Sequence, residues 1–304
     1  MILDLPHTTT SEINRELVRI RSEGGAVTLG RVMTLVIDAT CCDAESAIGA
    51  ANHASREHPC RVVVLAKSDA TEPRLDAEIR VGGDAGASEV IVLRPSGDMT
   101  GHGDTLIIPL LLPDAPIVAW WPGGPVSAPA LTALGAMATR RITDVRGSAD
   151  VRGALVALAD GYAPGDTDLA WARTTRWRAL LAAALDLPGS PTVTHVRIHG
   201  DTGSPAVLLL GAWLRAKLGC DFDDSYSDEA TGLVSVCLET PEGEIAIKRP
   251  DGQNATFIQP GLPDHVIALP RRTLQDCLAE DLRRLDADEV YGETLIALAG
   301  ALRS

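Results

Sequence analysis

Two adjacent thiols, Cys41 and Cys42, follow an apolar stretch of strand length at residues 30–39. Ligand sites of open α/β sheets form beyond the carboxyl ends of the strands, and a thiol becomes reactive there when a helix amino terminus lowers its pKa. Cys41 and Cys42 are therefore candidate redox residues. Simple packing is the alternative, because the six cysteines include no CxxC pair and fit reduced thiols.

Three polar side chains, His195, Arg197 and His199, alternate along a strand expected at residues 193–199, so they share one face of it. At about 3.3 Å per residue the two imidazoles are roughly 13 Å apart, too far to share a metal ion. Two interpretations remain, a polar outer face and anion binding by Arg197.

Other stretches resemble ligand sites but lack the required pattern. Glycines at residues 82–86 open a strand, whereas those of a dinucleotide fingerprint open a helix, so we expect a tight turn. The acidic residues 221–228 lack the glycine and distal glutamate of an EF-hand, and we expect a solvated loop. GxSxG, HExxH and Walker motifs are absent, so we predict no catalytic residue, no metal and no cofactor.

A long helix is expected at residues 168–186, between the breakers Pro164-Gly165 and Pro188-Gly189. At roughly 100° per residue, its tryptophans 171 and 177 lie about 120° apart, so two flanks must be buried. The second flank could face the preceding domain or another chain. Arginines interleave with these indoles, and Trp and Arg are enriched at binding hot spots. A core helix with snorkelling arginines is the alternative.

A second indole pair, Trp120 and Trp121, ends a strand expected at residues 117–121. Adjacent residues of a strand point to opposite faces of the sheet. We therefore expect one indole to pack in the core or as a lid and the other to be an exposed contact.

The order of the elements predicts an α/β domain at residues 1–165, with a mostly parallel sheet flanked by helices, and an α+β domain at residues 166–304. The first is Rossmann-like without the dinucleotide fingerprint. Its expected strands lie at residues 30–39, 60–66, 74–81, 89–93, 117–121 and 141–145. Its expected helices lie at residues 11–22, 43–57, 105–112, 128–139 and 151–162. The second domain adds strands at residues 193–199, 233–239, 244–248, 255–259 and 265–269 and helices at residues 205–219, 271–285 and 288–302.

The formal net charge of −14 disfavours nucleic acid and anionic membranes as partners, because both require a basic face. The most apolar run, residues 105–121, is interrupted by prolines and is not expected to span a membrane. The first residues have neither a basic nor an apolar signal region. We therefore expect a cytoplasmic protein.

Four segments rich in Trp, Pro and Arg are spread over both halves of the chain. They are VAWWPGGPV at residues 118–126, RRITD at 140–144, DLAWARTTRWR at 168–178 and LLGAWLRAKLG at 209–219. Together they resemble the OpcA family, the glucose-6-phosphate dehydrogenase assembly proteins. The resemblance implies a non-catalytic partner that binds glucose-6-phosphate dehydrogenase at the entry of the oxidative pentose phosphate pathway. Such a partner would promote the assembly or the active conformation of the dehydrogenase.

On that resemblance, the candidate contacts are the indole and arginine groups of these segments. They are Trp120, Trp121, Arg140, Arg141, Trp171, Arg173, Trp177 and Arg178. The competing hypothesis is an enzyme or sugar-phosphate-binding protein with its ligand at the top of the α/β sheet, near Cys41, Trp121 and Arg140. The sequence leaves self-association open.

Overall fold

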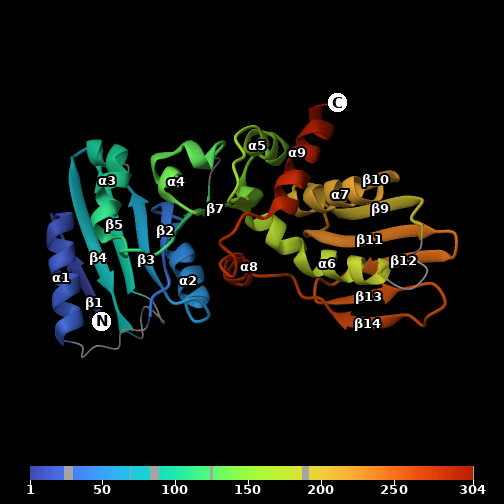
Figure 1. Cartoon of the computed structure of the whole chain (residues 1–304), viewed down its shortest axis with the longest axis horizontal. Coiled ribbons are helices and arrows are strands. Elements are labelled where there is room, and N and C mark those ends of the chain that lie inside the picture. Colours follow the sequence, from blue (N-terminus) through green and yellow to red (C-terminus); the bar gives the residue numbers. More distant parts are fainter. Residues whose placement is uncertain (24–29, 69, 83–88, 124–125, 187–191, 304) are drawn as a thin grey trace. The chain divides into compact units, whose positions relative to one another are not determined.

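The computed structural model describes residues 1–304 except 24–29, 69, 83–88, 124–125, 187–191 and 304 (Figure 1). The glycine-rich turn expected at residues 82–86 therefore lies almost wholly outside the described residues. The chain forms two compact units. Unit 1 comprises Met1–Asp144, Gly161–Thr167 and Leu274–Asp288, and unit 2 comprises Val145–Asp160, Asp168–Thr273 and Glu289–Ser304. Each unit thus takes sequence from both sides of residue 165, and the boundary placed there stays a prediction.

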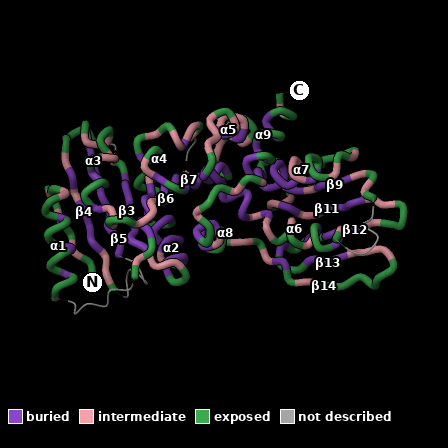
Figure 2. The backbone as a smooth tube through the Cα atoms, viewed as in Figure 1, coloured by how far each residue is buried: buried purple, intermediate pink, exposed green. Residues whose placement is uncertain are grey.

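Unit 1 is built on an eight-stranded sheet of order β1-β4-β5-β3-β2-β6-β7-β8. The pairs joining β5, β3, β2, β6 and β7 are parallel, while β1 and β4 are antiparallel. The strands are β1 (Ile2–Leu5), β2 (Met33–Thr40), β3 (Cys60–Lys67), β4 (Arg74–Arg80), β5 (Glu89–Ser96), β6 (Ile117–Trp121), β7 (Arg140–Thr143) and β8 (Asp166–Asp168). Strands β3 and β5 are buried along most of their length, as parallel strands covered on both faces must be (Figure 2). The predicted α/β class of this region is confirmed.

Helices of unit 1 shield this sheet. They are α1 (Thr10–Glu23), α2 (Ala44–Ala54), α3 (Gly103–Ile107), α4 (Ala133–Met137) and α8 (Leu274–Asp281). The apolar face of α1, including Ile13 and Leu17, packs in one core with Ile79 and Ile91 of the sheet.

The helix expected at residues 128–139 is wrong in extent. Its first part is a 3₁₀ turn, and the α-helix begins only after Thr132, whose hydroxyl accepts from the Gly135 amide at 2.9 Å. A Cβ on Gly135 would lie 1.8 Å from the Pro129 carbonyl oxygen. The turn is therefore folded too tightly onto α4 to continue as one helix.

Unit 2 contains a six-stranded sheet of order β10-β9-β11-β12-β13-β14. Its strands are β9 (His195–Asp201), β10 (Asp221–Ser227), β11 (Leu233–Thr240), β12 (Gly243–Lys248), β13 (Asn254–Ile258) and β14 (His265–Ala268). Helices α6 (Leu169–Leu185) and α7 (Pro205–Leu218) lie over one face of the sheet and share its apolar core (Figure 1). Helices α5 (Val151–Asp160) and α9 (Glu289–Arg303) pack on each other, and α9 also packs on α7. This unit is α+β, as predicted.

The acidic loop expected at residues 221–228 is instead largely strand β10, which pairs in parallel with β9. Asp223 lies opposite Arg197 in the register, and its carboxylate is 3.0 Å from the His195 ring. Acidic side chains are compatible with a strand here because β10 is an edge strand with a solvated face.

Helix α6 begins where its sequence indicated, because the Asp168 side chain accepts from the Ala170 amide at 2.8 Å. Trp177 faces the sheet core, and Trp171 lies 6.0 Å from the Tyr291 ring of α9. Burial on two flanks is confirmed, and the second flank packs on α9 of the same unit. Among the described helices, none is long and apolar enough to cross a membrane.

Candidate functional site

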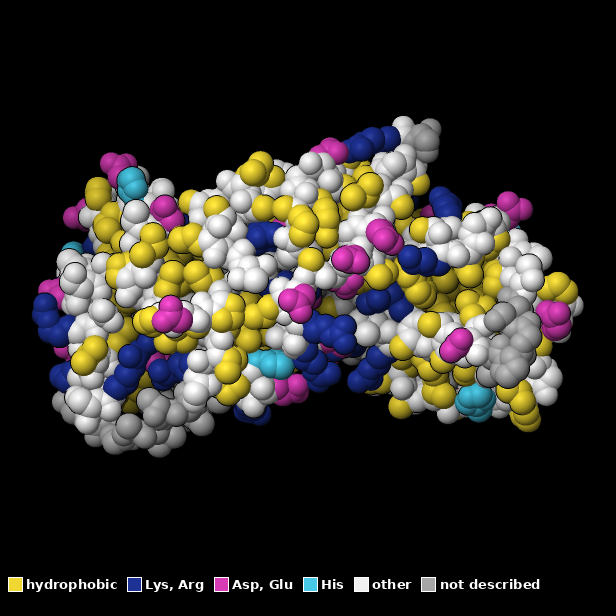
Figure 3. Space-filling view, viewed as in Figure 1, with side chains coloured by type: hydrophobic (Ala, Val, Ile, Leu, Met, Phe, Trp, Pro, Cys, Tyr) yellow, Lys and Arg dark blue, Asp and Glu magenta, His cyan; other side chains and the backbone are white. Residues whose placement is uncertain are grey.

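A pocket of about 260 Å³ in unit 2 gathers arginine side chains from segments far apart in the sequence. We call it the arginine pocket after its six arginines, Arg146, Arg173, Arg176, Arg249, Arg271 and Arg272. Figure 3 shows Lys and Arg side chains gathered over α6. Asp201 is the one carboxylate among the described lining residues, so the lining carries a strong excess of positive charge.

The pocket lies at the turn between β9 and α7. Strand β9, helix α7 and strand β10 form a βαβ unit, since the two strands are parallel. Gly203, Ser204 and Ala206, at the amino end of α7, line the pocket. A helix amino terminus presents backbone N–H groups and the positive end of the helix dipole, and therefore favours an anion.

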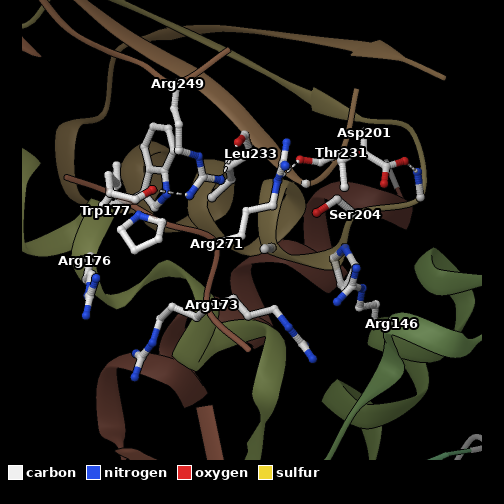
Figure 4. Close-up of a pocket in the computed structure, with 17 residues that line it drawn as sticks. Arg146, Arg173, Arg176, Trp177, Asp201, Ser204, Thr231, Leu233, Arg249 and Arg271 are labelled. Carbon is white, nitrogen blue, oxygen red and sulfur yellow. Dashed lines mark hydrogen bonds between the residues drawn. The ribbon is translucent and has the colours of Figure 1, made fainter. Parts of the chain in front are cut away.

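Arg249 is buried in the pocket wall, with 5% of its surface exposed. It donates to the carbonyl oxygens of Leu269 at 3.0 Å and Leu233 at 2.7 Å, and its guanidinium lies 5.0 Å from the Trp177 ring centroid (Figure 4). Burial, and then the neighbouring positive charge of Arg271, lower the pKa of Arg249 to about 10. The fold therefore holds a cation where its charge is poorly compensated.

Arg271 is held by the backbone around it. Its Nε donates to the Thr231 carbonyl at 3.0 Å (Figure 4). Its amide donates to the Gly252 carbonyl at 3.0 Å. Gly252 has φ +73°, and a Cβ there would lie 2.0 Å from Nη1 of Arg271. Glycine is thus required at residue 252 both for the turn and for the place of this guanidinium.

The remaining arginines come from other elements. Arg173 and Arg176 project from α6, and Arg146 lies in the 3₁₀ turn Val145–Gly147 (Figure 4). Arg272 donates to the Ala172 carbonyl of α6 at 3.0 Å. Guanidinium groups offer planar pairs of donors that match carboxylate and phosphate oxygens, so this arrangement can bind an anion.

The predicted contact residues fall into separate places. Trp120 and Trp121 are 0% and 4% exposed, so the exposed contact expected for one of them is wrong. Their strand, β6, lies inside the sheet with neighbours on both sides and layers on both faces, which buries both indoles.

Arg140 and Arg141 are buried and form ion pairs within unit 1. Arg140 donates to Asp281 at 2.6 Å and to the Asp286 carbonyl at 2.8 Å, which ties β7 to α8. Arg141 pairs with Asp166 and donates to the Ala138 carbonyl at 2.8 Å. Burial raises the pKa of Asp281, and the Arg140 charge opposes that shift.

The other four predicted residues lie on α6, two of them on the flank that faces the arginine pocket and two on the flank of Trp171. Arg173 and Trp177 line the arginine pocket. The guanidinium of Arg178 instead stacks over Trp171, 3.6 Å from the ring centroid, and its Nε donates to the Thr174 hydroxyl at 3.0 Å. Whether any of the eight residues contacts a partner stays a prediction.

A second pocket, of about 720 Å³, lies at the top of the α/β sheet and includes Cys41, Cys42 and Trp121. Arg140 lies at the amino end of β7, the opposite edge of the parallel sheet, so the predicted group does not form. Lys67, a cation of this pocket, pairs with Asp38 at 2.8 Å. The positive charge available to hold a phosphate is thus weaker here than in the arginine pocket.

The six thiols differ in burial, which predicts their reactivity. Cys41 and Cys42 are exposed, whereas burial raises the pKa of Cys60 to about 12. At pH 8 about one Cys60 thiol in ten thousand would be ionised. We expect Ellman's reagent to modify Cys41 and Cys42 in a fast phase and Cys60 only after denaturation. A fast phase of unchanged size in the Cys41→Ser/Cys42→Ser variant would contradict this prediction.

Anion binding by Arg197 is not supported, because the guanidinium forms an ion pair with Glu239 and lies 3.8 Å from Glu244. His195, Arg197 and His199 therefore form a polar outer face of the sheet, which is the other interpretation given for their alternating pattern. Within the described residues, no group of three or more His, Cys, Asp or Glu side chains is placed to hold a metal ion.

The predicted contact set contained Arg173 and missed the other five arginines of the pocket, at residues 146, 176, 249, 271 and 272. Arg176 lies on the same helix as Arg173, whereas the other four come from three separate segments that no local spacing relates. One signal was present, the stretch from Gly200 to Pro205, in which glycines follow a strand and open a helix. That pattern is typical of anion-binding turns.

Two family models match the chain. One, described as the glucose-6-phosphate dehydrogenase subunit N-terminal domain, matches residues 51–160, and the other, the C-terminal domain of that subunit, matches residues 164–295. Among solved structures, the chain is similar to an oxidoreductase from Sinorhizobium meliloti, with 10% identity, 89% of each chain covered and a TM-score of 0.42. No curated protein matches the chain.

Proposed function

The chain belongs to the OpcA family of glucose-6-phosphate dehydrogenase assembly proteins, and from this premise we propose that it binds glucose-6-phosphate dehydrogenase and promotes its active form. The observation that carries the proposal is the pair of family matches, at residues 51–160 and 164–295, both described as domains of a dehydrogenase subunit. The proposal places the protein in the cytoplasm, at the entry of the oxidative pentose phosphate pathway.

An effector of this kind acts only if it binds the active oligomer of the dehydrogenase more tightly than the inactive one. A coupling free energy of about 1–3 kcal/mol would change the active population by roughly five- to a hundredfold. Binding energy that is equal for both states would produce a complex without activation.

We propose that the role is non-catalytic. The described lining of the arginine pocket supplies cations, one carboxylate and two hydroxyl groups, which suits binding better than proton transfer. In the pocket at the top of the sheet, the thiol of Cys41 donates to the Lys67 carbonyl at 3.0 Å, a contact that satisfies the S–H group.

The exposed part of the predicted contact set lies on α6. Arg173 and Arg178 are partly exposed, whereas the four indoles and both β7 arginines are buried. We propose that the buried members shape the contact surface and that Arg173 and Arg178 meet the dehydrogenase directly. Arg178 tests this placement best, because it does not line the arginine pocket.

The experiment titrates glucose-6-phosphate dehydrogenase from the same organism with this chain and follows co-elution and dehydrogenase activity together. We expect a saturable rise in activity or substrate affinity that parallels the amount of complex. Arg178→Glu should weaken the complex by about tenfold, while Arg215→Glu, the same charge change on α7, should not. Activity unchanged at saturating chain would contradict the proposal. Equal effects of the two variants would contradict only the placement on α6.

A further inference from the structure

The arginine pocket concentrates positive charge in a chain whose formal net charge is −14. Its described lining has six arginines against one carboxylate, Asp201. The Oδ1 of Asp201 accepts from the Gly203 amide at 3.0 Å, so it also serves the turn that opens α7. Chance distribution of charge on an acidic protein does not favour such a cluster, and repulsion among the arginines opposes it.

Three of these arginines have no carboxylate partner among the described residues. Arg176 is exposed, and the side chains of Arg249 and Arg271 donate only to main-chain carbonyl oxygens. The Nε of Arg249 is buried without a hydrogen-bond partner in the described structure. The carboxylate whose charge acts on Arg249 belongs to the exposed Asp251, which only partly offsets burial and the charge of Arg271. A buried cation with so little compensation is unfavourable, so an anion bound beside Arg249 and Arg271 would stabilise Arg249 and reduce the repulsion between the two guanidinium groups.

The place of the cluster favours a small anion. The amino end of α7 adds the positive end of a 14-residue helix to the same pocket. Trp177, Leu233, Leu269 and Pro270 give the pocket an apolar wall, and the hydroxyl groups of Ser204 and Thr231 lie on the same lining (Figure 4). The volume of about 260 Å³ is near the lower limit of ligand pockets, which start at about 300 Å³.

We infer that the arginine pocket binds the phosphate group of a small phosphorylated metabolite, with the guanidinium groups and the α7 terminus on the phosphate and the apolar wall on the carbon skeleton. A phosphomonoester carries close to two negative charges and three acceptor oxygens at neutral pH, and therefore satisfies several arginines at once. The hydroxyl groups and Asp201 suit a hydroxylated skeleton, such as that of a sugar phosphate.

This inference does not depend on the proposed function, because it concerns the isolated chain. Failure of phosphate binding would leave the association with the dehydrogenase untouched. Failure of the association would likewise leave the ligand site intact. The two results are therefore measured separately, the first without any dehydrogenase present.

The test is calorimetric titration of the full chain at fixed ionic strength with four probes, inorganic phosphate, glucose 6-phosphate, unphosphorylated glucose and a hexaglutamate peptide. We expect both phosphates to bind at one site and glucose to give no signal. The Arg176→Ala/Arg271→Ala variant should lose about tenfold or more in affinity, because each removes charge-assisted hydrogen bonds. Arg215→Ala, at the other end of α7, is the matched control and should bind normally.

A second variant tests whether the position of the Arg271 guanidinium matters when the charge of the pocket is unchanged. Gly252→Ala keeps every arginine but places a Cβ 2.0 Å from Nη1 of Arg271, so it should also weaken phosphate binding. Circular dichroism of each variant verifies that it is folded. Binding of hexaglutamate in preference to both phosphates would overturn the inference and indicate an acidic protein partner. Absence of saturable phosphate binding, or binding that the pocket variants leave unchanged, would overturn it as well.

Discussion

Replacing Arg140 with alanine is expected to lower the free energy of unfolding of unit 1 by about 3–5 kcal/mol. The substitution leaves the Asp281 carboxylate, which is 8% exposed, without its ion-pair partner at 2.6 Å. It also removes the donor to the Asp286 carbonyl, a further bond from β7 to the segment that follows α8. Urea denaturation followed by circular dichroism measures the loss.

The loss of stability in Arg140→Ala is expected to grow as the pH rises. Burial already raises the pKa of Asp281, and removing Arg140 removes the main opposing effect. A carboxyl group whose folded pKa lies above its unfolded pKa destabilises the fold increasingly as pH rises through the folded value. The deficit of Arg140→Ala should therefore be smaller at pH 5 than at pH 8.

A matched control lies two residues beyond the buried carboxylate. Arg283 forms a 3.1 Å ion pair with Glu57, and the two side chains are 61% and 50% exposed. Arg283→Ala should change stability by less than about 1 kcal/mol, because exposed pairs contribute little. The apolar double variant Arg140→Met/Asp281→Leu should recover much of the loss. Equal losses for Arg140→Ala and Arg283→Ala would contradict the structural role of the buried pair.

Replacing Trp177 with alanine is expected to lower the free energy of unfolding of unit 2 by about 3–5 kcal/mol. The indole is 1% exposed and packs with Leu181 and Val196 between α6 and the sheet. Its removal opens a cavity and takes away the ring that lies 5.0 Å from the guanidinium of Arg249. Urea denaturation of the variant and the parent protein measures the effect.

Trp213 provides a control of the same residue type in the same unit. It lies on α7 and is only partly buried, so Trp213→Ala should cost about 1 kcal/mol. A loss at Trp213 as large as that at Trp177 would contradict the assignment of Trp177 to the core.

The parts of the fold that could be predicted depend on local patterns. Val- and Ile-rich runs identified β2, β3 and β5, because strands buried on both faces require them. The strands expected at residues 233–239 and 244–248 are β11 and β12, which pair as an antiparallel hairpin whose turn includes Gly243 at φ +137°. Local chemistry was sufficient in these places because neighbours in the sequence determine the geometry.

The errors arise where distant segments decide the outcome. Both Trp120 and Trp121 are buried because layers on each face of the sheet cover β6. These layers come from other segments of the chain, so the sequence of the strand does not reveal them. The grouping of α8 with unit 1 and of α5 with unit 2 depends on packing between elements more than a hundred residues apart.

The arginine pocket was missed for the same reason. Its arginines come from the segment before α5, from α6 and from the turns after β12 and β14, and only the fold brings them together. The predicted candidates Arg173 and Trp177 do line this pocket. Both lie on one helix, α6, which its sequence pattern already singled out. Arg249 and Arg271 have no sequence spacing that relates them to that helix.

Sedimentation velocity of glucose-6-phosphate dehydrogenase from the same organism, alone and with an excess of this chain, tests whether the chain binds and assembles the enzyme. We expect the chain to co-sediment with the dehydrogenase and to shift it toward the oligomer that carries the higher activity. Unchanged sedimentation of the dehydrogenase, with and without its substrate, cofactor or a reductant, would show that the chain is not its assembly factor.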